Sequence, residues 1–189
     1  MSAAVESSTG RDLSRMLAPR TIAVVGATNR PESVGYSVLR NLLFNECQGT
    51  VYPVNPKRDS VLGVRCVKSV LEIPEPVDLA IMIIPPRGVL EVMEQCAQIG
   101  VRNVLVISAG FKEVGGEGEV MEQRLREIAR DNGMNVIGPN CLGIIVPGLK
   151  LNASFAAAMP EAGHVAFISQ SGALCTAVLD WAIDEGIGF

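Results

Sequence analysis

The sequence predicts an α/β protein whose first domain is a Rossmann-like, doubly wound parallel sheet. Short, continuous apolar runs rich in Val and Ile alternate with segments of helical periodicity, as expected when parallel strands are buried on both faces. In addition, the first apolar run ends at a glycine that leads into a helix. Sheets of this kind bind a nucleotide phosphate at such a turn.

The strands and helices follow one another in a regular order. Strands are expected at 21–25, 50–54, 78–84, 102–107 and 134–137, and Gly143–Val146 could add a last one. Helices are expected at 34–45, 88–99 and 118–131, where apolar residues recur every three to four positions. Leu13–Leu17 could form one helical turn. Strand–helix–strand repeats with short links produce a parallel sheet with helices on both faces.

We divide the chain into four parts. Residues 1–11 are rich in Ser and Ala and read as a flexible tail, and residues 12–146 form the first domain. Residues 147–163 read as a linker. Residues 164–189 begin a second α/β domain, with a strand at 164–168 and a helix over about 172–185. One strand and one helix cannot bury both faces of a sheet, so we expect the N-terminal piece of a longer protein, cut early in the second domain.

Composition argues against several classes of protein. The net charge is −4 and there is no basic run, which argues against nucleic acid as a partner. The apolar runs are too short to cross a membrane, and no secretory signal is present. The five cysteines are dispersed without a Cys-x-x-Cys pair. We therefore expect no disulfide framework and no metal site, but reduced thiols in a cytoplasmic protein.

Two segments predict a phosphorylated nucleotide cofactor. The turn after the first strand offers backbone N–H groups and a helix start to a phosphate; its candidate ligands are Gly26, Ala27, Thr28, Asn29, Arg30, Val34 and Gly35. Asn55 stands 20 residues after Gly35, where a nicotinamide-binding unit carries an acid, and Lys57 follows it. A lysine attracts a ribose phosphate that an acid would repel. Coenzyme A, with its 3′-phosphate and pyrophosphate, is the leading candidate.

Further candidates follow the next strands. Ligands bind at the carboxyl ends of parallel strands, and the residues expected there are Pro85, Pro86, Ser108, Ala109 and Gly110. The prolines could instead simply start the next helix. Glu113 is either a solvated loop acid or part of the site, and Asn140 either holds the fold or faces a substrate.

The second domain offers one more candidate site. Ser171 and Gly172 form a strand-to-helix turn that could bind an anion. Ser169 stands where a nucleophile elbow would need glycine, which argues against a hydrolase. His164 is the only histidine and reads as a surface or packing residue, so no catalytic residue is predicted.

Five segments, in this order, resemble the NDP-forming acyl-CoA synthetase family, which includes the succinyl-CoA synthetase alpha subunit and the ADP-forming acetyl-CoA synthetases. They are Ile22–Thr28, Val54–Lys57, Val106–Phe111, Gly138–Gly143 and Ile168–Gly172. The resemblance covers about residues 12–189. It implies a flavodoxin-like second domain, CoA pyrophosphate in the first loop, Lys57 on the adenosine phosphate, and Ser108, Ala109 and Gly110 along the pantetheine arm.

The resemblance also implies a reaction. Acyl-CoA and phosphate give an acyl phosphate and CoA, and a histidine then carries the phosphoryl group to ADP on an ATP-grasp module. The partners would be CoA or acyl-CoA and further domains or a beta-type ATP-grasp subunit that binds ADP or ATP with Mg²⁺. The helix at Ser171 and Gly172 would steady a phosphohistidine that lies beyond Phe189, so this piece alone should be inactive.

Two alternatives stay open. One is a non-catalytic CoA-binding or regulatory module, for example in a fusion with a protein acetyltransferase. The other is an NADP-dependent oxidoreductase, which would need a second domain with a proton donor. The acyl substrate cannot be read from the sequence.

Overall fold

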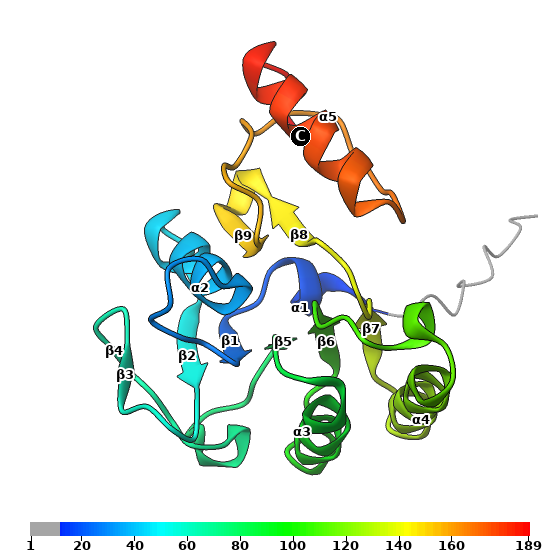
Figure 1. The fold of residues 1–189 in the computed structure, drawn as a ribbon. Coiled ribbons are helices and arrows are strands. Elements are labelled where there is room, and N and C mark those ends of the chain that lie inside the picture. The colour runs from blue at the N-terminus through cyan, green and yellow to red at the C-terminus, as the bar shows by residue number, and fades with distance from the viewer. Residues whose placement is uncertain (1–11) are drawn as a thin grey trace, which may run out of the picture.

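The structure, a computed structural model, describes residues 12–189 (Figure 1). The predicted tail at 1–11 lies outside the described residues. The strands are β1 (Thr21–Val25), β2 (Thr50–Val54), β3 (Ser60–Val61), β4 (Val64–Arg65), β5 (Leu79–Met82), β6 (Asn103–Val106), β7 (Asn135–Ile137), β8 (Gly143–Val146) and β9 (Leu151–Ser154). The α-helices are α1 (Ser14–Leu17), α2 (Val34–Phe44), α3 (Pro86–Gln98), α4 (Glu117–Asp131) and α5 (Gly172–Asp184), and short 3₁₀ helices are η1 (Val70–Glu72), η2 (Lys112–Val114) and η3 (Pro147–Leu149).

The centre of the fold is a parallel sheet. Within residues 12–189 it has five strands in the order β2-β1-β5-β6-β7, and every neighbouring pair is parallel. This confirms the predicted doubly wound α/β fold. The chain runs outward from β1 to β2 and then crosses to β5 on the other side of β1. Such a change of direction leaves a crevice at the carboxyl ends of the strands, where ligands bind.

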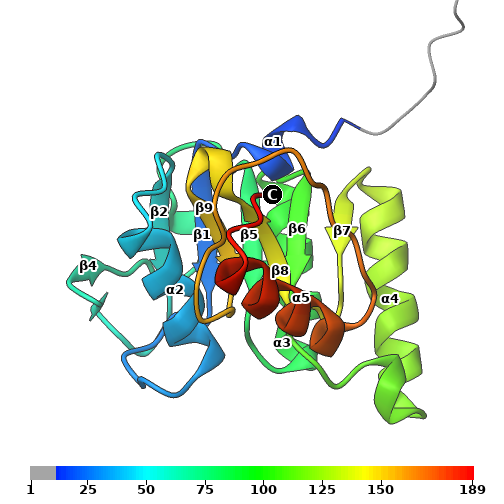
Figure 2. The ribbon, with the colours of Figure 1, turned by 90° about the horizontal axis from the view of Figure 1, so that it is seen from above.

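Alternate residues of the central strands enter two separate cores. Ala23 and Val25 of β1 pack against α3 and α4, whereas Ile22 and Val24 pack against α2 and β9. Figures 1 and 2 show α3 and α4 on one side of the sheet and α2 with the β8–β9 hairpin on the other. Both faces are therefore covered, which explains why β1, β5 and β6 read as continuous apolar runs.

The chain between β7 and α5 differs from the prediction. Gly143–Val146 is a strand, but it pairs antiparallel with β9 in a separate hairpin and does not join the parallel sheet. β9 lies inside 147–163, which reads as a linker in the sequence. The sequence signal for this strand is weak, because two of its four residues, Asn152 and Ser154, are polar. All four are nevertheless buried.

Two further elements differ from the prediction. The prediction of a strand at 164–168 is wrong, because this segment is coil and Ile168 is 95% exposed. A strand needs a neighbour for its backbone hydrogen bonds, and the described part of the chain provides none for this segment. The β3–β4 hairpin was not predicted. Its turn holds Leu62 and Gly63 at φ of 50° and 79°, and Leu at such a position is not a recognised turn signal.

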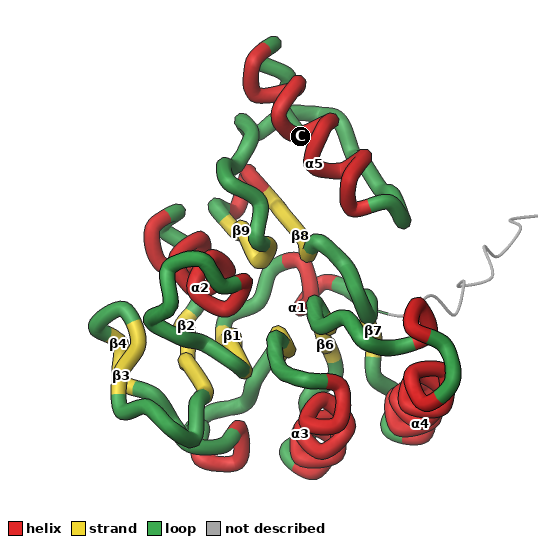
Figure 3. Tube along the Cα trace, viewed as in Figure 1, coloured by secondary structure: helices red, strands yellow, loops and turns green. Residues whose placement is uncertain are grey.

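The tube view in Figure 3 shows α5 standing beyond the hairpin, away from the parallel sheet. Its helix was predicted and is confirmed. Its buried residue is Ala182, while Leu174, Trp181 and Ile183 are exposed. No helix within residues 12–189 is both long and apolar enough to span a lipid bilayer.

A buried amide joins the β8–β9 hairpin to α2. Asn41 of α2 is 4% exposed, and its Nδ2 donates to the carbonyl oxygens of Ser154 and Ala156, each at 2.9 Å. Ser154 Oγ donates to Asn152 Oδ1 at 2.6 Å and accepts from the Ala156 N–H at 3.1 Å. The end of β9 is therefore fixed to the helix by hydrogen bonds that are shielded from water.

Replacing Asn41 with Ala should destabilise the fold. Two buried carbonyl groups would lose their donor, at about 1–3 kcal/mol each, so we expect the free energy of unfolding to fall by about 3 kcal/mol. Urea denaturation followed by circular dichroism measures this change. Asn45→Ala is the control, since Asn45 bonds only to the carbonyl of its own helix at Asn41; it should cost about 1 kcal/mol or less. Equal losses in the two variants would contradict the role of Asn41.

Candidate functional site

The loop between β1 and α2 depends on two glycines. Gly26 has a φ of 97°, and a Cβ placed there would lie 2.2 Å from the carbonyl oxygen of Ile83, just beyond β5. A Cβ at Gly35, in the first turn of α2, would lie 2.3 Å from the carbonyl oxygen of Gly26. Neither position can hold a side chain without moving backbone. α2 therefore begins directly against the end of the sheet, with its free N–H groups at the crevice.

Two amide side chains among the predicted ligands, Asn29 and Asn55, bond to neighbouring loops. Asn29 Oδ1 accepts from the Leu62 N–H at 2.9 Å, which joins the first loop to the β3–β4 hairpin. Asn55 Nδ2 donates to the carbonyl oxygen of Ala27 at 2.7 Å, and its Oδ1 accepts from the Lys57 N–H at 2.9 Å. Asn55 therefore connects the first loop with the turn that carries Lys57. Both amides shape the crevice.

Positive charge gathers at this end of the crevice. Arg30 and Lys57 are exposed, and within residues 12–189 neither forms an ion pair with a carboxylate. Lys68, by contrast, pairs with Asp59 at 2.7 Å. The hydroxyl of Thr28 accepts from the Arg30 N–H at 3.3 Å. Two cations are therefore available to an anion near the first loop.

Ser108 connects three strand ends. Its Oγ accepts from the Ile84 N–H at 3.0 Å and donates to the Met82 carbonyl at 3.2 Å, both at the end of β5. Its carbonyl oxygen accepts from the N–H of Asn140, which follows β7, at 3.0 Å. Ser108 itself follows β6. Its side chain is small, as expected for a residue beside a cofactor, but it also holds the floor of the crevice together.

The two prolines and Gly110 pack closely. Pro86 occupies the first turn of α3 and Pro85 its N-cap, so the prolines do start the helix. Gly110 has a φ of 102°, and a Cβ there would lie 2.8 Å from Cγ of Pro86. Ala109, between Ser108 and Gly110, is exposed. At Ser108, Ala109 and Gly110, the loop after β6 therefore presents small side chains toward the crevice.

Glu113 holds this loop in place. Its Oε1 accepts from the Gly110 N–H at 2.6 Å and its Oε2 from the Phe111 N–H at 3.2 Å. Burial acts to raise the pKa of the carboxyl, but the backbone donors together outweigh burial and lower the pKa below its ordinary value of 4.5. The charged carboxylate is thus a structural part of the loop.

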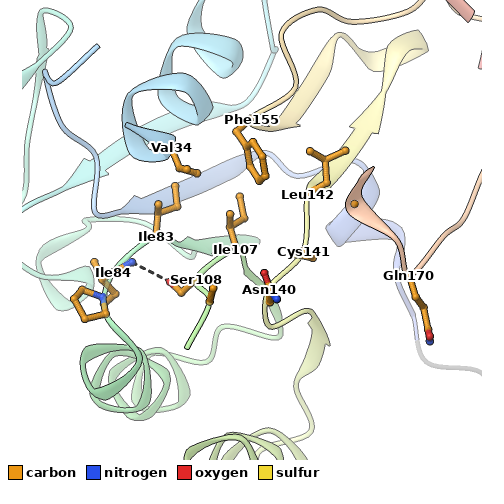
Figure 4. Close-up of a pocket in the computed structure, with 13 residues that line it drawn as sticks. Val34, Ile83, Ile84, Ile107, Ser108, Asn140, Cys141, Leu142, Phe155 and Gln170 are labelled. Carbon is orange, nitrogen blue, oxygen red and sulfur yellow. Dashed lines mark hydrogen bonds between the residues drawn. The ribbon is translucent and has the colours of Figure 1, made fainter. Parts of the chain in front are cut away.

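A cavity of about 610 Å³ lies above these strand ends (Figure 4). It is lined by Val34, Ile83, Ile84, Pro85, Ile107, Ser108, Ala109, Asn140, Cys141, Leu142, Phe155, Gln170 and Gly172. Most of its wall is apolar, with polar groups at a few positions, as in sites for small molecules. It extends from the sheet to the start of α5.

Only some of the predicted site residues line the cavity. Val34, Pro85, Ser108, Ala109 and Gly172 line it. The remaining predicted residues do not; they are Gly26, Ala27, Thr28, Asn29, Arg30, Gly35, Asn55, Lys57, Pro86, Gly110 and Ser171. The first five of these follow β1, Gly35 lies in the first turn of α2, and Asn55 and Lys57 follow β2. Ser171 caps α5, its Oγ accepting from the Leu174 N–H at 3.3 Å.

Several lining residues were not among the predicted ligands. Asn140, for which the sequence left a structural or a substrate-facing role open, and Cys141 both follow β7 and line the cavity. The rule that placed Ser108 at the site applies to them too. Leu142 and Phe155 belong to the ends of the β8–β9 hairpin, for which the sequence carried no such signal. Burial raises the pKa of the Cys141 thiol to about 11, and the thiol donates to the Val106 carbonyl at 3.3 Å. Cys141 is therefore a neutral thiol at neutral pH.

Other groups do not add chemistry to the cavity. His164 is exposed and does not line it. In the described part of the chain, no three His, Cys, Asp or Glu side chains come together as they would around a metal ion. The cavity has the character of a binding site for a mostly apolar group, and the cations Arg30 and Lys57 lie outside it.

Glu113→Gln should make stability less dependent on pH. Because the folded pKa of Glu113 is lowered, its carboxylate contributes stability above the ordinary pKa of 4.5, and this contribution is lost as pH falls through the folded pKa. The urea midpoint of the variant should therefore lie below that of the original chain at pH 7 and approach it at pH 3. Glu91→Gln, at an exposed position on α3, is the control. A constant difference between pH 7 and pH 3 would contradict this role.

Two family models match the chain. Residues 20–147 match the CoA binding domain, and residues 162–189 match the succinyl-CoA ligase like flavodoxin domain.

Curated relatives match almost the whole chain. An acetate–CoA ligase [ADP-forming] I of Archaeoglobus fulgidus is 45% identical over 177 residues, which are 94% of this chain and 26% of that protein. The alpha subunit of acetate–CoA ligase [ADP-forming] II of Pyrococcus furiosus is 49% identical over 172 residues, 90% of this chain and 37% of that subunit. The chain therefore spans between a quarter and two fifths of the length of these relatives.

A solved structure has the same fold. The dinucleotide forming acetyl-coenzyme A synthetase 1 of Ca. Korarchaeum cryptofilum, in complex with phosphate and ADP, superposes with a TM-score of 0.89 at 43% identity. The match covers 94% of this chain and 38% of that one. The resemblance to the NDP-forming acyl-CoA synthetases is thus confirmed, and the chain belongs to the CoA-binding domain family.

Proposed function

We propose that this chain is the CoA-binding part of an ADP-forming acyl-CoA synthetase. The observation that carries the proposal is the match of residues 20–147 to the CoA binding domain, combined with a crevice that has cations at one end and an apolar cavity at the other. The relatives that are ADP-forming ligases support the same conclusion.

The order of the strands supports a route for CoA across the sheet. Lys57 follows β2, the glycine loop follows β1, Pro85 follows β5 and Ser108 follows β6, and these strands are neighbours in this order. Neighbouring strands lie about 4.8 Å apart, so these segments extend over roughly 15 Å. In the proposal, the adenosine phosphate lies by Lys57, the pyrophosphate at the glycine loop, and the pantetheine arm along Pro85 and Ser108.

Each part of the crevice would act on a different part of the ligand. The N–H groups at the start of α2 and the exposed Arg30 suit a pyrophosphate. The small side chains at Ala109 and Gly110 leave room for the narrow pantetheine arm. The sulfur would then enter the cavity of about 610 Å³, between Asn140 and the start of α5.

In the proposed reaction, phosphate attacks the thioester carbon of an acyl-CoA, the carbon–sulfur bond breaks, and an acyl phosphate and CoA form. The phosphoryl group then passes to a histidine, which releases the acid, and from the histidine to ADP to form ATP. His164 is the only histidine of this sequence, is exposed and does not line the cavity. In the proposal, the phosphorylated histidine and the Mg²⁺-dependent ADP site belong to other parts of the protein or to a partner subunit. This chain contributes binding and orientation of CoA.

Lys57→Ala should weaken the binding of CoA but not of dephospho-CoA. A contact between an exposed lysine and a phosphate is worth about 1–2 kcal/mol, so Kd for CoA should rise about 5- to 30-fold. Isothermal titration calorimetry of the 189-residue chain with CoA, dephospho-CoA, NADPH and NADH measures these affinities. CoA should bind most tightly to the original chain.

The matched control is Arg20→Ala. Arg20 is an exposed cation that directly precedes β1. It lies at the amino ends of the strands, opposite the crevice, so its loss should leave both affinities unchanged. If Lys57→Ala weakened CoA and dephospho-CoA equally, Lys57 would not contact the 3′-phosphate. Tighter binding of NADPH than of CoA would contradict the proposed function.

The 189-residue chain alone should not form acetyl-CoA. Phosphoryl transfer needs an acceptor held in line with the reacting phosphate and charge neutralised around it, and the described residues offer neither at His164. Incubation with ATP, Mg²⁺, acetate and CoA should therefore yield no acetyl-CoA above a blank, and radiolabelled ATP should not label the chain. Acetyl-CoA formation that disappears in His164→Ala would overturn this expectation.

A further inference from the structure

The open end of the β8–β9 hairpin places two apolar side chains at the cavity. The antiparallel pairing ends at Gly143 and Ser154, so Leu142 and Phe155 follow at the next pair of positions. Both line the cavity, and Figure 4 shows the ring of Phe155 directed toward the side of the cavity where Val34, Ile83 and Ile107 lie. Leu142 and Phe155 are called the hairpin wall below.

Phe155 of the hairpin wall is exposed, whereas Leu142 is partly buried. Phe155 is 40% exposed, and Val34 across the cavity is 37% exposed. Moving an aromatic ring out of water lowers the free energy of the system. The ring therefore offers binding energy to an apolar group that enters the cavity.

The position of Phe155 is fixed from both sides. Asn41 Nδ2 donates to the carbonyl oxygens of the residues before and after it, Ser154 and Ala156, each at 2.9 Å. Asn41 and Ser154 are themselves buried. A surface that is held in place before its ligand arrives loses little conformational entropy on binding.

The hairpin wall and the proposed pantetheine route meet in one cavity. Ser108 and Ala109 line the cavity from the sheet, Gly172 lines it from α5, and the hairpin wall lines it from a third direction. A thioester that reaches the cavity along Ser108 would carry its acyl group past the sulfur, into the remaining space.

We propose that the hairpin wall is the acyl-binding surface, so that the acids used here carry an apolar chain that packs against Phe155. The inference rests on the proposed function and adds the class of acyl group. It requires that the affinity of an acyl-CoA increases with the length of its chain, through contact with Phe155. Acetyl-CoA should bind, and propanoyl-CoA and butanoyl-CoA should bind more tightly.

The test is the dependence of Kd on acyl length. Calorimetry of the 189-residue chain with CoA, acetyl-CoA, propanoyl-CoA and butanoyl-CoA should show Kd falling about threefold for each added methylene, a little less than the full burial of a CH₂ would give. In Phe155→Ala the three acyl-CoAs should bind with equal Kd, while Kd for CoA stays within twofold of the original. Phe155→Leu should keep most of the length dependence.

The matched control is Phe44→Ala, which removes a 70% exposed ring at the end of α2, outside the cavity. It should leave the length dependence intact. Equal Kd values for all acyl-CoAs in the original chain, or an unchanged length dependence in Phe155→Ala, would overturn the inference while CoA binding upholds the proposed function. A parallel loss for CoA and every acyl-CoA in Phe155→Ala would also overturn it, because the pantetheine arm would then cover the ring. Failure of the original chain to bind CoA would contradict the proposed function itself.

Discussion

The crevice depends on close contact between the backbones of neighbouring strand ends. A Cβ at Gly26, after β1, would lie 2.2 Å from the carbonyl oxygen of Ile83 beyond β5, and a Cβ at Gly138, after β7, would lie 2.2 Å from that of Val106 at the end of β6. Both glycines have a φ of 97°. The absence of side chains at these two turns lets the loops lie directly on the sheet. The loops at these two turns therefore lie closer to the strand ends than any side chain there would allow.

Hydrogen bonds from side chains then join these loops into one surface. Asn55 joins the end of β2 to the first loop, Ser108 joins the ends of β5, β6 and β7, and Glu113 holds the turn after β6. Sequence reasoning assigned Asn55 and Ser108 to the ligand because both follow strands of the parallel sheet, Asn55 at the position where a nicotinamide-binding unit carries an acid and Ser108 as a small side chain. Whether such a residue faces a ligand or a neighbouring loop depends on which backbone groups lie within 3 Å, and a sequence does not contain that information.

Long, regular elements could be predicted and short, irregular ones could not. β5 and β6 are buried on both faces, so their apolar runs are unambiguous, and α4 shows clear helical periodicity. The hairpin strand at Leu151–Ser154 mixes polar and apolar residues, and the buried polar side chains of Asn152 and Ser154 bond to each other. The apolar run at 164–168 has the composition of a strand, yet strand formation depends on a pairing partner and not on composition alone. Phe155 could not be assigned to the site for the same reason, since its place follows from the hairpin.

The polar network behind Phe155 is difficult to explain by stability alone. Asn152 and Ser154 are fully buried, and within the described residues Asn152 Nδ2 has no hydrogen-bond partner. A buried polar nitrogen without a partner costs free energy, and an apolar interface of similar volume would avoid that cost. The network provides a defined backbone position, because directional hydrogen bonds between amide and carbonyl groups fix the backbone more strictly than apolar contacts do. The backbone that it fixes carries the exposed ring of Phe155, so the network holds one wall of the cavity in a defined position.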